Sequence, residues 1–106
     1  MAKYMMSASY TVEGTKGLIK DGGSGRRTAV QKAIEGLGGR LECFYFALGE
    51  EDAFAIVEVP DEVTIAAASL AINATGGAHV ATKVVLTPEQ IDEAVKKSVR
   101  YRAPGA

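Results

Sequence analysis

Three polar side chains lie at the ends of predicted strands. Tyr10 lies near the end of the first strand, Asp52 begins the second strand of a hairpin, and His79, the only histidine, lies at the start of the last strand. A phenol, a carboxylate and an imidazole supply proton transfer or orienting hydrogen bonds. Each also has a structural interpretation, as a core aromatic residue, a turn residue that accepts backbone N–H bonds, and a surface or interface histidine. We therefore treat them as candidate ligand-binding residues and assign no catalytic residue.

A glycine-rich stretch, GGSGRR at residues 22–27, is a candidate anion site. Ser24 is predicted to cap the helical segment that follows. Backbone N–H groups at that helix start, with Arg26 and Arg27 nearby, would bind phosphate or carboxylate. The stretch lacks the Lys-Ser/Thr ending of a P-loop and does not follow Gly-x-Gly-x-x-Gly. The alternative interpretation is a hinge in a bent helix.

Metal and thiol chemistry find little support in the sequence. His79 has no partner histidine, and Cys43 is the only cysteine, so it forms no intrachain disulfide and by itself no zinc site. Cys43 lies between apolar neighbours and is predicted to be a buried, inert thiol. Glu50 and Glu51 beside Asp52 form a carboxylate cluster, for which we favour a solvated turn. We expect no metal and no cofactor.

Length and composition indicate one globular domain. The chain has 106 residues, of which 47% are hydrophobic and 24% charged, which argues against disorder. We expect a domain over residues 1–100 and a flexible tail over residues 101–106. A net charge of −1 and 7% aromatic residues offer no basic field for nucleic acid. No apolar run is long enough for a membrane span and no signal peptide is recognisable, so the cytoplasm is the expected location.

The pattern of apolar residues predicts a β-α-β-β-α-β order with a short C-terminal helix. The predicted strands cover residues 4–11, 40–48, 52–59 and 78–87. The first helical stretch begins at Glu13 and is interrupted by DGGSG, and Asp61 and Thr87 are predicted N-caps of two further helices. This order is the ferredoxin-like arrangement, in which two helices cover one face of a four-stranded antiparallel sheet.

The central hairpin is apolar on both faces. One face of its first strand carries Leu41, Cys43, Tyr45 and Ala47, and the other carries Phe44, Phe46 and Leu48. An antiparallel sheet with one solvated face normally alternates polar and apolar residues. Two helices cover only one face, so a second copy of the chain is the economical cover for the other. We therefore expect a homodimer with the sheets packed face to face, or a trimer in which the sheets line a central core.

The same segments resemble a known family. The string Gly49–Asp52 followed by AFAIVEVPD resembles the Gly-x-Tyr-Asp hairpin of the GYD domain family, with Glu51 in place of the signature tyrosine. The first strand with Thr11 and Gly14 is similar to the family's first strand and helix start. The resemblance covers residues 3–97. It implies a dimeric α+β barrel with a ferredoxin-like fold, and it implies little chemistry.

Three functions remain open at this point. The first is a structural or interaction module that forms a homodimer or a higher homo-oligomer. The second is a small-molecule-binding protein or a cofactor-free enzyme, with at least two of Tyr10, Asp52 and His79 in one cavity between helices and sheet. The third is an anion or nucleotide sensor that uses residues 22–27. We favour the first, with the second close behind, and expect no nucleic-acid or membrane partner.

Overall fold

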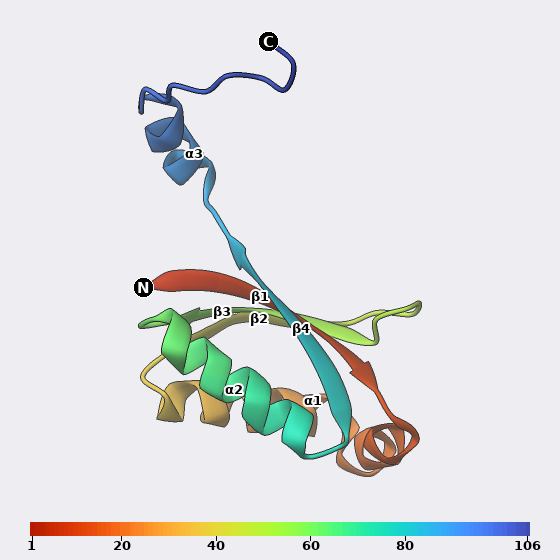
Figure 1. The fold of residues 1–106 in the computed structure, drawn as a ribbon. Coiled ribbons are helices and arrows are strands. Elements are labelled where there is room, and N and C mark those ends of the chain that lie inside the picture. The colour runs from red at the N-terminus through yellow and green to blue at the C-terminus, as the bar shows by residue number, and fades with distance from the viewer.

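The chain folds as a four-stranded antiparallel sheet with two long helices beneath it (Figure 1). The computed structural model describes residues 1–106. The elements in chain order are β1 (Ala2–Tyr10), α1 (Val12–Gly36), β2 (Arg40–Phe46), β3 (Ala53–Val59), α2 (Glu62–Ala74), β4 (Ala78–Val85) and α3 (Pro88–Val95). The strands are ordered β2-β3-β1-β4. This confirms the predicted ferredoxin-like α+β fold.

Polar caps set the starts of the helices. At α2, Asp61 Oδ1 accepts a hydrogen bond from the Thr64 backbone N–H at 2.8 Å. At α3, Thr87 and Gln90 form the reciprocal capping box, with hydrogen bonds of 3.1 and 2.8 Å. These bonds satisfy N–H groups that have no partner inside the helix. Both caps confirm the sequence predictions.

The glycine-rich stretch bends α1 without ending it. Only Gly22 leaves the helical region, with φ of 75° and ψ of 166°. Glycine adopts such angles without the clash that a Cβ would cause. Helical structure then continues through Ser24, whose carbonyl accepts the Thr28 hydroxyl at 3.0 Å. The predicted Ser24 cap is therefore replaced by a kink two residues earlier.

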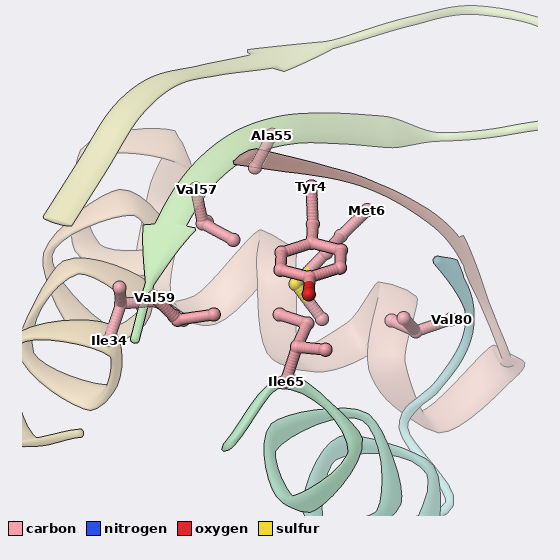
Figure 2. Packing of buried hydrophobic residues seen from close by; sticks show 8 residues of the cluster. All are labelled: Tyr4, Met6, Ile34, Ala55, Val57, Val59, Ile65 and Val80. Carbon is pink, nitrogen blue, oxygen red and sulfur yellow. The ribbon is translucent and has the colours of Figure 1, made fainter. Parts of the chain in front are cut away.

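The core lies between the sheet and the two long helices (Figure 2). β1 contributes Tyr4 and Met6, and the side chains that β3 contributes lie in the same layer. The full cluster is Tyr4, Met6, Ile34, Ala55, Val57, Val59, Ile65 and Val80. Only Ile34 comes from α1 and only Ile65 from α2. The helices therefore rest on the sheet through few large side chains.

A bulge in β2 changes which face one residue occupies. Leu41 pairs with Val57 and Cys43 pairs with Ile56, so Glu42 is an extra residue between them. The inserted residue shifts the alternation, and Leu41 packs against the core on the helix side. The prediction that Leu41 shares a face with Cys43 is therefore wrong. The rest of the alternation holds, because Phe44 also packs against the core.

The opposite face of the sheet is bare, and α3 stands on that side. Figure 1 shows α1 and α2 below the sheet, and α3 with the C-terminal segment above it and clear of the body. The molecule is correspondingly elongated, with extents of 56 × 33 × 22 Å. None of the helices combines the length and the hydropathy needed to cross a membrane. We call residues 86–106 the C-terminal arm.

Candidate functional site

A cavity of about 80 Å³ lies between the sheet and the helices. Eleven of its twelve lining residues are hydrophobic. The strands place small side chains there, including Ala8, Ala53 and Ala55. Because alternate strand residues point to the same face, these alanines leave space where larger residues would fill the core. The one charged residue in the lining is Arg26.

A groove of about 470 Å³ adjoins this cavity between α1 and α2. Met6, Arg26, Val30 and Ile72 line both spaces. Five of its eleven lining residues are alanines, namely Ala29 and Ala33 on α1 and Ala67, Ala68 and Ala71 on α2. Such short side chains do not fill the space between the two helices. Ten of the eleven lining residues are hydrophobic, and Arg26 is the exception.

A third hollow, of about 280 Å³, lies beside the first half of α1. Tyr10, Arg26 and Ile72 line both this hollow and the central cavity. Asp21 and Thr75 add polar groups to it. We call the cavity, the groove and this hollow together the helix-side pocket. Arg26 is the charged residue common to all three parts, so it sets the electrostatic character of the pocket.

Arg26 is half-buried and weakly paired. Its side chain is 35% exposed, and its polar partner in the structure is Asp21, with 3.7 Å between Arg26 Nη1 and Asp21 Oδ2. That separation exceeds the length of a charge-assisted hydrogen bond, which is about 2.7–2.9 Å. The Gly22 kink lies between the two residues. The guanidinium therefore keeps most of its hydrogen-bonding capacity for another partner.

The first predicted set, Tyr10, Asp52 and His79, does not converge in one cavity. Tyr10 lines the helix-side pocket. Asp52 uses Oδ2 to accept the Tyr10 backbone N–H at 2.8 Å, and its own N–H donates to the Ala8 carbonyl at 2.8 Å. His79 is exposed and pairs with Ser9 across β1 and β4. Tyr10 thus lines the pocket, Asp52 links the hairpin to β1, and His79 is exposed to solvent.

The structure divides the second predicted set, because Ser24 and Arg27 line one hollow and Arg26 lines another. Arg26 lines the helix-side pocket, whereas Arg27 lies beside Phe46 at the outer edge of the sheet. Ser24 is exposed and its carbonyl belongs to the helix. Consecutive helix residues point about 100° apart, which explains how neighbouring arginines reach different surroundings. An anion site that uses all three side chains together is not seen, and anion binding by Ser24 and Arg27 stays a prediction.

The bare sheet face carries a charge network. Glu58 pairs with Arg40 and lies 3.6 Å from Lys3 Nζ, and Lys3 also bonds Glu42. The Arg40 hydrogen bond, helped by both cations, lowers the pKa of Glu58 below its usual value. The Glu42 hydrogen bond raises the pKa of Lys3.

Beyond the charge network, the bare face is apolar at its centre. Met5 of β1 pairs with Ile56 of β3, which in turn pairs with Cys43 of β2. Phe54 and Tyr45 stack next to them, with ring centroids 5.7 Å apart. The side chains of these residues alternate with those that point to the core. This half-buried apolar centre has no cover within the chain (Figure 1).

A cavity between helices and sheet with Tyr10 in its lining was one of the expected alternatives, but the sequence assigned Arg26 to a separate site and did not predict that both residues line one pocket. A signal for it exists in the alanines at core-facing positions of β1 and β3. Comparison with known proteins adds one finding. A family model of the GYD domain matches residues 4–95, from β1 to the last residue of α3. Among curated proteins, none matches the chain.

Proposed function

The chain belongs to the GYD domain family, and we propose that this member is a homo-oligomeric protein that binds a small, mostly apolar molecule in the helix-side pocket. The observation that carries the proposal is the apolar lining of adjoining spaces that share Arg26 as their charged residue. Ligand sites are typically concave and apolar, with a few polar groups that fix orientation. Tyr10 and Arg26 supply those groups here.

Binding has more support than catalysis. The hypothesis of a small-molecule-binding protein or a cofactor-free enzyme expected at least two of Tyr10, Asp52 and His79 in one cavity, and the binding proposal made here replaces that set with Tyr10 and Arg26. Tyr10 alone lines the helix-side pocket, while the Asp52 carboxylate is engaged by the Tyr10 backbone. A general acid–base pair would need both groups within hydrogen-bond reach of one substrate atom. The pocket is therefore proposed as a binding site.

Two features support a homo-oligomer. The bare sheet face has an apolar centre and, at one end, a cluster of paired charges of both signs, and protein interfaces commonly combine an apolar core with polar surroundings. A cluster of mixed charge suits a two-fold contact, because the same patch must complement itself. The C-terminal arm stands on the same side of the sheet (Figure 1). A second copy packed on this face would meet the arm of the first.

The pocket is tested with an uncharged bicyclic probe, 2-naphthamide, and two matched tryptophan variants of α2. Ala71 and Ala66 are both exposed residues of this helix, but Ala71 lines the groove and Ala66 lines none of the pocket. We expect the wild-type protein and Ala66→Trp to bind one probe per chain in calorimetric titration, and Ala71→Trp to bind none. Equal binding by all three proteins would place the probe elsewhere and contradict the proposal, as would an absence of binding.

A further inference from the structure

We propose that the molecule bound in the helix-side pocket is a small carboxylate on an apolar body, with Arg26 as the residue that selects its charge. This inference rests on the proposed binding function and specifies the class of ligand. A pocket that needed only apolar contacts would not require a guanidinium, because a partly buried cation is costly without a partner. The structure places that cation where the three parts of the pocket adjoin.

Asp21, the partner of Arg26 within the chain, offsets only part of the cost of burying the Arg26 guanidinium. Asp21 Oδ2 lies 3.7 Å from Nη1, and the Asp21 side chain is 46% exposed. A pair with this separation and exposure contributes little. A carboxylate would instead make two parallel N–H···O bonds with the planar guanidinium. Arg26 is thus arranged as a receptor for a group that the chain itself does not supply.

The balance of charge around the pocket favours a monoanion over a phosphate. Arg26 is the only cation in the lining of any of the three parts, and Asp21 lies at the edge of one of them. A dianion would gain one ion pair and meet repulsion from Asp21. Phosphate sites generally combine several cations or backbone N–H groups. A single planar carboxylate matches what this pocket offers.

The rest of the lining defines the body of the ligand. Met6, Val30 and Ile72 separate the central cavity from the groove and line both. These side chains lie beside the Arg26 guanidinium and would contact the hydrocarbon part of the ligand. Tyr10 is the one further hydrogen-bonding side chain of the central cavity. An aromatic or medium-chain carboxylic acid fits this combination of one charged end and an apolar remainder.

The test compares 2-naphthoate with its neutral isostere 2-naphthamide by calorimetric titration of the full chain. Wild-type protein should bind the carboxylate about tenfold to a hundredfold more tightly, because a hydrogen bond to a charged group contributes that much. Arg26→Gln should remove this preference while keeping affinity for the amide, and Arg26→Lys should restore part of it. Arg27→Gln is the matched control, since Arg27 lies outside the helix-side pocket. It should behave as wild type.

The outcomes separate this inference from the proposed function. If both probes bind wild-type protein equally, the pocket binds ligands but Arg26 does not select a carboxylate, and the inference is overturned. The same holds if Arg27→Gln loses the preference or if Arg26→Gln retains it. If neither probe binds, the proposed function fails together with the inference. Inorganic phosphate serves as a second probe, and competition by phosphate with 2-naphthoate at similar concentration would overturn the choice of a monoanion.

Discussion

Asp52 Oδ2 accepts a hydrogen bond from the Tyr10 backbone N–H at 2.8 Å, across 42 positions of sequence. The Asp52 backbone N–H also donates to Ala8, so the carboxylate and the amide of one residue hold two points of β1. This arrangement fixes the end of β1 against the β2–β3 hairpin. It also places Tyr10 just before the start of α1, where the Tyr10 side chain lines the helix-side pocket.

The first prediction concerns this hydrogen bond. Asp52→Ala should lower the free energy of unfolding by about 1–2 kcal/mol, because a part-buried N–H loses a charged acceptor. Asp52→Asn should cost less, since the amide oxygen still accepts. Urea unfolding measures both effects, with Glu51→Ala as the control at an exposed neighbouring carboxylate. A loss as large for Glu51→Ala as for Asp52→Ala would refute the assignment.

The second prediction concerns the close approach of α1 to the start of β4. A Cβ built on Gly14 would lie 1.7 Å from the Gly77 carbonyl oxygen, whereas one on Gly17 would meet nothing within 4 Å. Gly14→Ala should therefore destabilise the fold by about 1–3 kcal/mol through overpacking. Gly17→Ala should stabilise it by about 0.5–1 kcal/mol, because alanine loses less backbone entropy in a helix. Thermal unfolding of the pair checks the sign; the same response from both would show that the contact is not tight.

A third prediction concerns the bare sheet face. Ile56 lies at its centre, between Met5 and Cys43. Ile56→Lys should convert the proposed dimer into a monomer, because an unpaired ammonium would be buried at the interface. Val63→Lys is the control, at an apolar residue of α2 that is 79% exposed. Sedimentation velocity distinguishes the states. A monomeric wild type would reject the proposed assembly, and a dimeric Ile56→Lys would place its interface on another face.

The fourth prediction concerns pH. Hydrogen bonds from the backbone and hydroxyl of Thr64 lower the pKa of Asp61 below its usual value of 3.8. Because the folded pKa is depressed, the cap stabilises the fold fully above pH 3.8 and loses this effect as pH falls through the folded pKa. The difference in unfolding free energy between wild type and Asp61→Ala should therefore shrink below that pH. Asp61→Asn, which caps without titrating, should keep a constant advantage over Asp61→Ala. A wild-type advantage that stays constant down to acid pH would contradict the shift.

Local signals made most of the fold predictable. Asp61 and the Thr87–Gln90 box identify helix starts because the capping bonds join residues three positions apart. The antiparallel hairpin follows from two alternating segments joined by a short turn. The bulge at Glu42 was not predictable from alternation, because an inserted residue is recognised only from its partners across the sheet.

The candidate site was less predictable, because it depends on where helices lie relative to the sheet. Tyr10 and Arg26 lie 16 positions apart, and the sequence suggested separate sites for them. Their proximity depends on the Gly22 kink and on the distance between α1 and α2. Arg26 and Arg27 are neighbours in the sequence and yet line different hollows. The orientation of a helix about its own axis therefore decided the site, and periodicity alone did not reveal it.

The fifth prediction concerns the C-terminal arm. A helix as short as α3 is marginal in water on its own, and its Ile91 and Val95 remain 47% and 76% exposed. We expect these side chains to pack on a second copy, because the arm stands on the side of the bare face (Figure 1). Ile91→Asp should therefore weaken dimerisation by about tenfold or more, because the variant loses the apolar contact of Ile91 and places a carboxylate at the interface.

The matched control for the arm is Asp92→Asn on the same helix. This variant removes a charge from an exposed position of α3 and adds no charge to the face that carries Ile91 and Val95. Sedimentation equilibrium over a range of concentrations gives the dimerisation constant of each variant. If Ile91→Asp and Asp92→Asn dimerise as wild type, the arm lies outside the interface. The Ile56→Lys variant supplies a monomer in which the effect of Ile91→Asp on stability can be measured alone. Because α3 stands clear of the core, adding Ile91→Asp to this variant should leave its thermal stability unchanged. A fall in thermal stability would instead show that α3 packs on its own chain.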